Sequence, residues 1–123
     1  MFKMVSIFIV EDEPSLQLIY KNMFDYLGFQ VVDIASNGRD AVKKFESFVE
    51  KPDIIIMDYR LPIKNGIDAA KEILEIDKKS KIIIVTADKN IRDEALTIGV
   101  TSFKEKPCPI NLLKNNIIKA LKA

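Results

Sequence analysis

Short apolar runs punctuate the chain, and a polar residue follows each of them. Ile-Ile-Ile-Met at residues 54–57 and Ile-Ile-Ile-Val at residues 82–85 are the strongest runs; Ile-Phe-Ile-Val at residues 7–10 is similar, and Ser-Phe at residues 102–103 is weaker. Runs rich in β-branched residues that do not alternate with polar ones are typical of parallel strands buried on both faces. They predict four strands, and residues 29–34 predict a fifth.

Between the runs, apolar residues recur at helical spacing. The first helix is expected to begin at Pro14, which a first helical turn tolerates, and to stop at Gly28. A shorter helix over about residues 90–98 is closed by Gly99, and the last helix starts near Pro109. The apolar face of the first helix consists of Leu16, Ile19, Tyr20, Met23 and Leu27, and that of the second consists of Ala41, Val42, Phe45 and Phe48. The third helix presents Ile67, Ala70, Ile73 and Leu74, and the last presents Leu112, Leu113, Ile117 and Leu121.

Strand and helix signals therefore alternate five times, which indicates an α/β protein. The expected fold is a flavodoxin-like (βα)5 three-layer sandwich, with a parallel five-stranded sheet of order 2-1-3-4-5 and right-handed crossovers. We expect one domain over residues 1–123 and no output domain, because no linker, repeat or low-complexity stretch interrupts the pattern.

Polar residues stand where the predicted strands end. Glu11 and Asp12 follow the first strand, Asp58 follows the third, Thr86 follows the fourth, and Lys106 lies shortly after the fifth. Parallel strands place their carboxyl ends on one edge of the sheet, where open α/β folds bind ligands. Three carboxylates, a hydroxyl and an ammonium group are therefore expected to converge on one site.

Composition narrows the chemistry of that site. The chain has no histidine, which excludes a Ser-His-Asp arrangement, an imidazole base and a histidine-ligated zinc site. The lone Cys108 allows no internal disulfide and favours a reducing cytoplasm. A net charge of +1 neither recommends nor excludes nucleic acid as a partner. We expect no membrane insertion, because spanning requires about 18 consecutive apolar residues.

The converging side chains suit phosphoryl transfer. Neighbouring carboxylates repel one another unless a cation intervenes, and Mg²⁺, or Mn²⁺ with the same oxygen ligands, fits such a pocket. A carboxylate can attack phosphorus to give an aspartyl phosphate. A metal ion and a lysine then neutralise the charge on the transferring group, and a threonine hydroxyl can hydrogen-bond one of its oxygens.

The motifs Ile-Val-Glu-Asp-Glu (residues 9–13), Met-Asp-Tyr-Arg-Leu-Pro (57–62), Val-Thr-Ala (85–87) and Lys-Pro (106–107) together resemble those of two-component response-regulator receiver domains. The resemblance implies that Asp58 accepts a phosphoryl group from a histidine kinase or a histidine phosphotransfer protein. It implies that Glu11, Asp12, Asp58 and the backbone carbonyl of Arg60 hold Mg²⁺. It also implies a cis peptide bond between Lys106 and Pro107, an unknown downstream protein target and no direct contact with nucleic acid.

The same resemblance assigns roles around the phosphoryl group. Lys106 would pair with it, and Thr86 would bind it and report its presence. Phe103 stands at the position of the family's switch aromatic, often tyrosine, and lacks the hydroxyl that would lock the switched state. Arg60 and Asp88 stand at positions that tune dephosphorylation. The resemblance leaves open whether the chain is a relay intermediate or a terminal adaptor.

Each residue, taken alone, also fits a structural role. Asp12 before a proline would serve as a helix N-cap, Thr86 as a β-branched strand end, Lys106 as a solvated charge and Phe103 as a core aromatic. Capping explains Asp58 poorly, because no helix follows it directly. These structural interpretations would have to coincide at one sheet edge by chance, which makes them improbable together.

Four other functions share parts of the pattern. Haloacid-dehalogenase-type phosphatases require a second acid two residues after the first, where this chain has Arg60, and the Asp-x-Asp of Toprim nucleases fails at the same position. Flavodoxin-like electron transfer requires a phosphate-binding loop in place of residues 11–14. A phosphorylation-independent interaction module would be favoured only without the acidic residues or Lys106.

Overall fold

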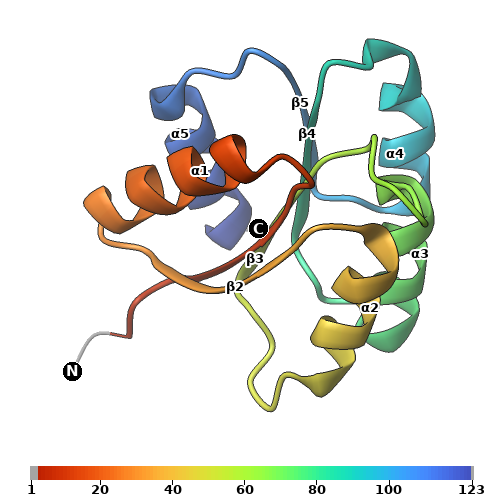
Figure 1. Cartoon of the computed structure of the whole chain (residues 1–123), viewed down its shortest axis with the longest axis horizontal. Coiled ribbons are helices and arrows are strands. Elements are labelled where there is room, and N and C mark those ends of the chain that lie inside the picture. Colours follow the sequence, from red (N-terminus) through yellow and green to blue (C-terminus); the bar gives the residue numbers. More distant parts are fainter. Residues whose placement is uncertain (1–2, 123) are drawn as a thin grey trace.

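The computed structural model describes residues 3–122, which form five strands, five α-helices and one short 3₁₀ helix (Figure 1). In chain order these elements are β1 (Ser6–Val10), α1 (Pro14–Tyr26), β2 (Gln30–Ala35), α2 (Gly38–Ser47), β3 (Ile54–Met57), α3 (Gly66–Ile76), β4 (Ile82–Thr86), the 3₁₀ helix η1 (Lys89–Ile91), α4 (Arg92–Ile98), β5 (Ser102–Glu105) and α5 (Ile110–Lys122).

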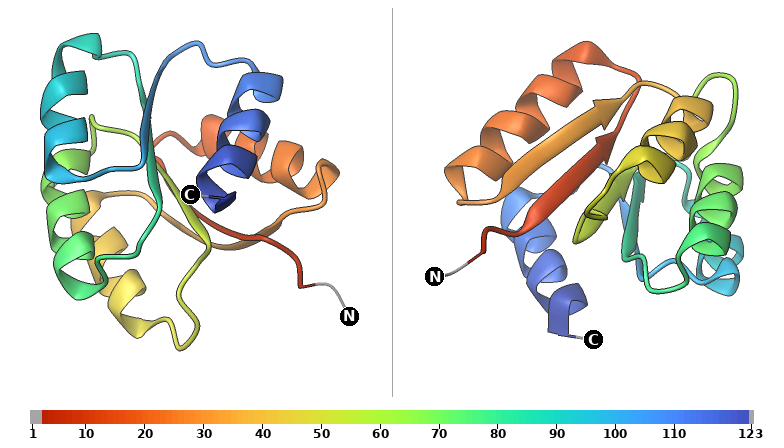
Figure 2. Two further views of the ribbon diagram at one scale, coloured as in Figure 1. Left: turned by 180° about the vertical axis from the view of Figure 1, so that it is seen from behind. Right: turned by 90° about the horizontal axis from the view of Figure 1, so that it is seen from below.

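The strands form one parallel sheet in the order β2-β1-β3-β4-β5. Helices α1 and α5 cover one face of this sheet, and α2, α3 and α4 cover the other (Figures 1 and 2). The predicted fold class and strand order are therefore confirmed. Among the described residues, no helix is both long enough and apolar enough to cross a membrane.

Each central strand contributes to two apolar layers because successive side chains point to opposite faces of the sheet. In β1, Ile7 and Ile9 pack toward α1 and α5, whereas Phe8 and Val10 pack toward α2, α3 and α4. All four side chains are buried, as the absence of alternation in the run predicted. The core fixes the register of β1 against β3, so their ends meet at one edge.

The buried face of α1 differs from the predicted one. Ile19 was expected on that face but is half exposed, and Phe24, which was not assigned to it, is completely buried. Tyr20 and Phe24 stack with ring centroids 5.8 Å apart and pack against the core between α1 and α5. Because these two residues are four positions apart, they lie on one side of α1, and the buried side of the helix is rotated slightly from the predicted one.

The segment expected to be one helix over residues 90–98 is divided. It starts as the 3₁₀ helix η1 and continues as α4 from Arg92. Asp88 precedes η1, but its side chain makes no capping hydrogen bond and instead binds Arg60. Gly99 ends α4 in the left-handed conformation, with φ of 106°, as predicted.

Candidate functional site

Backbone hydrogen bonds place the predicted site residues at the carboxyl ends of neighbouring strands. The N–H of Asp58 donates to the carbonyl of Val10 at 3.0 Å, which ties the end of β3 to β1. The N–H of Lys106 donates to the carbonyl of Thr86 at 2.9 Å, which brings the segment after β5 alongside the end of β4. The peptide bond between Lys106 and Pro107 is cis, as the resemblance implied.

Glu11, Asp12 and Asp58 form a cluster of three carboxylates. One oxygen from each lies within 4.8 Å of the others. Glu11 is 2% exposed, Asp58 is half-buried and Asp12 is exposed, so the cluster opens to solvent on one side. This all-oxygen set, with room left for water, fits the way proteins hold Mg²⁺ through one or two carboxylates and several waters.

Lys106 provides the positive charge next to the cluster. Its Nζ lies 2.9 Å from Asp58 Oδ2 and 3.2 Å from Glu11 Oε1. Burial disfavours the ammonium ion, but the hydrogen bonds and charges of Asp58 and Glu11 outweigh burial and raise the pKa of Lys106. The lysine therefore stays protonated at neutral pH and offsets one of the three negative charges.

Glu11 is the most deeply buried of the three carboxylates. Burial raises its pKa, and the negative charge of Asp58 adds to this effect. The N–H of Glu13, which donates to Glu11 Oε2 at 3.1 Å, and the charge of Lys106 act in the opposite direction without cancelling it. Ionised Glu11 therefore carries an unfavourable energy that a bound cation would relieve.

Thr86 and Phe103 lie on the neighbouring strands β4 and β5. Thr86 ends β4, is 1% exposed, and its Oγ1 accepts a hydrogen bond from the N–H of Asp88 at 3.3 Å. Phe103 pairs with Ile84 across the sheet and is half-buried against the core on the side of α2, α3 and α4. Its partial burial is compatible with both a core role and a switch role.

Arg60 and Asp88 form a bidentate ion pair that sequence analysis did not predict. Nη2 of Arg60 donates to Oδ1 of Asp88 at 2.6 Å, and Nε donates to Oδ2. The hydrogen bond to Arg60 lowers the pKa of Asp88, and the hydrogen bond and charge of Asp88 raise the pKa of Arg60. The two residues are 28 positions apart, so no local pattern indicates that they meet.

Asp12 is not the N-cap of α1, so the structural role considered for it is wrong. Helix α1 begins at Pro14, and the residue at its N-cap position is Glu13, which makes no side-chain capping hydrogen bond. Proline at the first helical position has no N–H to satisfy, so the need for a cap is reduced. Asp12 is left exposed beside the other two carboxylates.

Two neighbours of the cluster were missed as site residues. Tyr20 was assigned only to the apolar face of α1, but it lies within electrostatic range of Lys106, Glu11 and Asp58; burial is the main cause that raises its pKa to about 12. Nε2 of Gln17 donates to the carbonyl of Glu11 at 2.5 Å. Helical spacing could indicate that Tyr20 is buried, but nothing in the sequence indicates either contact.

The backbone at the start of α3 lies very close to the backbone of Asp58. The N–H of Gly66, the first residue of α3, donates to the carbonyl of Tyr59 at 2.8 Å. A Cβ at this glycine would lie 2.1 Å from the carbonyl oxygen of Asp58. Only glycine lets α3 begin so close to Asp58, the residue that follows β3.

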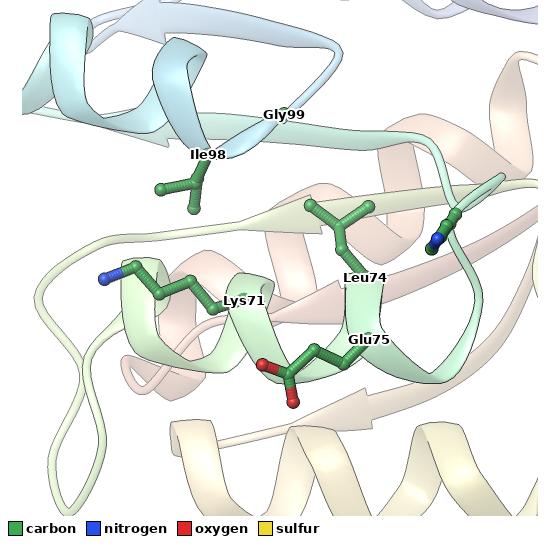
Figure 3. A pocket seen from close by; sticks show the side chains of 6 residues that line it. Lys71, Leu74, Glu75, Ile98 and Gly99 are labelled. Carbon is green, nitrogen blue, oxygen red and sulfur yellow. The ribbon is translucent and has the colours of Figure 1, made fainter.

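A hollow lies between α3 and α4 (Figure 3). It contains none of the predicted site residues, and its wall combines apolar side chains with lysines and a glutamate. Its lining residues are Lys71, Leu74, Glu75, Lys78, Ile98 and Gly99.

The acidic cluster and its lysine, at the carboxyl edge of a 2-1-3-4-5 sheet, define a class of signalling phosphoacceptors rather than conventional enzymes. The sequence model of the response regulator receiver domain matches residues 7–118. The chain therefore belongs to the receiver-domain family of two-component signalling, and Glu11, Asp12 and Asp58 form the acidic pocket typical of its phosphoacceptor site.

Individual relatives agree with this assignment. The chain is 39% identical to the chemotaxis protein CheY of Thermotoga maritima over 103 residues, which cover 82% of this chain and 84% of the relative. It is 33% identical to CheY of Bacillus subtilis over 117 residues, which cover 94% and 96%.

A solved structure adds information about the metal. The receiver domain of a sensor histidine kinase from Pseudomonas aeruginosa superimposes with a TM-score of 0.88 at 28% identity, covering 98% of this chain and 100% of that one. That protein was solved with a magnesium ion coordinated in its active-site cleft.

Proposed function

We propose that Asp58 accepts a phosphoryl group from a phosphohistidine of a histidine kinase or a histidine phosphotransfer protein. Glu11, Asp12, Asp58 and the backbone carbonyl of Arg60 would hold Mg²⁺, for which Mn²⁺ could substitute. The single observation that carries the proposal is the contact of Lys106 Nζ with Asp58 Oδ2 at 2.9 Å, beside the cluster of three carboxylates.

The side chains divide the chemistry between them. A carboxylate oxygen of Asp58 attacks phosphorus, and the bond to the donor nitrogen breaks. Lys106, already beside this carboxylate, exchanges part of its contact for an oxygen of the incoming phosphoryl group. A bound divalent ion supplies the remaining charge neutralisation at the phosphoryl oxygens. The protein thus catalyses its own modification mainly by positioning and electrostatics.

Thr86 and Phe103 are proposed to convert phosphorylation into a change of surface. The Thr86 hydroxyl would turn toward a phosphoryl oxygen and give up its contact with the N–H of Asp88. The space that it vacates would let Phe103, which is only half-buried, rotate inward. The readout would therefore appear on β4, η1, α4 and β5.

The signalling role follows from the relatives. CheY proteins match this chain over most of their own length, which supports a domain that acts through its own surface in the cytoplasm. A CheY from Borrelia burgdorferi, 25% identical with a TM-score of 0.87, was solved with CheX, beryllofluoride and magnesium. A downstream protein target that recognises the phosphorylated surface is the corresponding expectation here, and α1 and α4 are the proposed docking helices.

The test of the function is the uptake of one phosphoryl group from a small phosphodonor. Incubation with phosphoramidate and Mg²⁺ is expected to add the mass of a single phosphoryl group, and chelation of Mg²⁺ is expected to prevent it. Absence of any magnesium-dependent mass increase in the folded protein would refute the proposal.

Magnesium affinity is expected to decrease as the pH is lowered. The cation binds the ionised form of Glu11, whose pKa is raised by burial, so metal binding must displace a proton once the pH drops through that raised value. Calorimetric titrations between about pH 5 and pH 8 should show weaker binding and greater proton release at the acidic end. Glu11→Gln should remove most of this dependence; an equally steep dependence in the variant would contradict the assignment.

Beryllofluoride, a mimic of the phosphoryl group, is expected to shift amide resonances well beyond the pocket. Signals of Thr86, Phe103 and α4 should move in the wild type, and Thr86→Ala should reduce the shifts at Phe103 and α4 while leaving those at Asp58. Shifts confined to the pocket in the wild type would show that the proposed switch does not operate.

A further inference from the structure

An apolar cavity lies between helix α1 and the segment that follows β5. Its volume is about 410 Å³, within the range of about 300–1,000 Å³ that is typical of small-molecule pockets. The apolar side chains in its wall are Leu16, Ile19 and Met23 of α1 and Pro107 of the facing segment. No acidic residue is among the described residues that line this cavity, so its own wall offers no negative charge.

The hydroxyl of Tyr20 is a donor without a partner at this cavity. Tyr20 is 8% exposed and lines the cavity, and its hydroxyl makes no hydrogen bond within residues 3–122. Buried tyrosine hydroxyls usually have a hydrogen-bond partner. Burial raises the pKa of Tyr20 to about 12, so the hydroxyl keeps its proton at neutral pH and can donate it. A hydrogen-bond acceptor inside the cavity would satisfy this group.

Lys106 supplies a second donor at the same cavity. An ammonium group has three N–H donors, and the contacts with Asp58 at 2.9 Å and Glu11 at 3.2 Å use two of them. Cys108, the remaining lining residue, donates its thiol to the carbonyl of Pro109 at 3.8 Å, and burial raises the pKa of this thiol. The cavity therefore offers one hydroxyl donor and one cationic donor within an otherwise weakly polar wall.

We propose that this cavity binds a small carboxylate with an apolar body, of the kind represented by a medium-chain fatty acid. The Tyr20 hydroxyl and the Lys106 ammonium donate to the carboxylate oxygens, and the hydrocarbon lies against the apolar wall. The single positive charge, already shared with two carboxylates, suits a singly charged anion better than a doubly charged phosphate.

Binding at this cavity is expected to affect phosphorylation through Lys106. The ligand carboxylate competes with Asp58 for the ammonium group, which the proposed phosphoryl transfer requires beside the phosphoacceptor. This regulatory consequence rests on the proposed function, whereas binding itself does not. A bound divalent cation favours binding of the anion, because it offsets negative charge of the cluster formed by Glu11, Asp12 and Asp58.

The hollow between α3 and α4 provides a comparison within the same molecule (Figure 3). Its volume of about 420 Å³ is nearly the same, and it combines apolar side chains with Lys71 and Lys78. However, Glu75 also lines this hollow, and none of its described lining residues carries a hydroxyl. A carboxylate that merely adheres to lysines and apolar side chains should therefore occupy both places, whereas the proposed ligand should occupy only the cavity beside α1.

A titration with octanoate, followed by amide resonances at saturating Mg²⁺ without a phosphodonor, tests the site. We expect saturable shifts at Ile19, Tyr20 and Cys108, with a Kd of about 0.1–1 mM, and none at Leu74 or Ile98 of the hollow. Octanol, which lacks the charge, should bind about tenfold more weakly. Acetate, which lacks the apolar body, should cause no saturable shift in the same range.

Two variants of α1 test the assigned donor. Tyr20→Phe removes only the hydroxyl and is expected to weaken octanoate binding about fivefold to tenfold. Because this hydroxyl has no partner in the folded chain, the variant should unfold in urea no earlier than the wild type. Tyr26→Phe is the matched control: it removes the same group from the same helix at a position that is 91% exposed, and it should bind octanoate like the wild type.

The outcomes separate the site from the function beside it. Octanoate shifts spread equally over both places, or equal affinities of Tyr20→Phe and Tyr26→Phe, would overturn the site. At saturating octanoate the initial rate of phosphorylation by phosphoramidate should fall about threefold or more; an unchanged rate would overturn the effect on Lys106 while leaving the site. A wild type that binds octanoate at the cavity but takes up no phosphoryl group would refute the proposed function alone.

Discussion

Replacing Lys106 with methionine is expected to slow phosphorylation of Asp58 by a factor of about 100 or more. Nζ of Lys106 lies 2.9 Å from Asp58 Oδ2 and 3.2 Å from Glu11 Oε1. The methionine keeps most of the apolar stem but removes the charge that is proposed to neutralise the transferring phosphoryl group. The substitution also leaves the half-buried carboxylate of Asp58 and the buried carboxylate of Glu11 without the positive charge beside them.

The measurement is the initial rate of mass increase with phosphoramidate and Mg²⁺. Lys104→Met is the matched control, because it removes the same charge from the same segment two residues earlier, and it is expected to stay within about twofold of the wild type. A Lys106→Met protein that remains folded and is phosphorylated as fast as the control would contradict the role assigned to this lysine.

Substituting Gly66 with alanine is expected to cost about 2–4 kcal/mol of the free energy of unfolding. The added Cβ would lie 2.1 Å from the carbonyl oxygen of Asp58, so β3 and α3 must move apart. Both partners of this contact are backbone, and neither can give way by a side-chain rotation. The movement would also displace Asp58 from the other carboxylates.

Urea denaturation followed by circular dichroism gives the free energy of unfolding. Gly28→Ala serves as the control: Gly28 has a φ of 87° but nothing within 4 Å of its Cβ position, so its cost of about 1 kcal/mol is backbone strain alone. A Gly66→Ala protein that is no less stable than Gly28→Ala would mean that this close approach does not constrain the site.

The fold was predictable because the strand pattern leaves few alternatives. The runs at residues 54–57 and 82–85 contain almost nothing but isoleucine and valine, so each can be buried on both faces of a parallel sheet. Parallel strands then bring Glu11, Asp12 and Asp58 to one edge whatever the details of the loops. The meeting of these carboxylates is therefore a consequence of topology.

The exact buried side of a helix and the backbone conformation of a single loop residue were not predictable from the sequence. The inner face of α1 is rotated enough to bury Phe24 and expose half of Ile19, and periodicity alone does not resolve that difference. The backbone of Ile63, with φ of 72°, adopts a left-handed conformation that is uncommon for a β-branched residue. No sequence preference indicates it.

The Arg60–Asp88 pair was missed for a related reason. Each residue was recognised by its position relative to Asp58 or Thr86, but their contact depends on the path of two loops and on the rotamers of both side chains. The structure places them together, although neither position alone indicates the contact.

The central claim is that Asp58 is the phosphoacceptor, and mass measurement of two proteins side by side tests it most directly. Wild type and Asp58→Asn would each be incubated with phosphoramidate and Mg²⁺, and then measured intact and as peptides. We predict one added phosphoryl group on the wild type, located in the peptide that contains Asp58, and none on the variant. An equal mass increase on folded Asp58→Asn, or a label on another peptide of the wild type, would contradict the account.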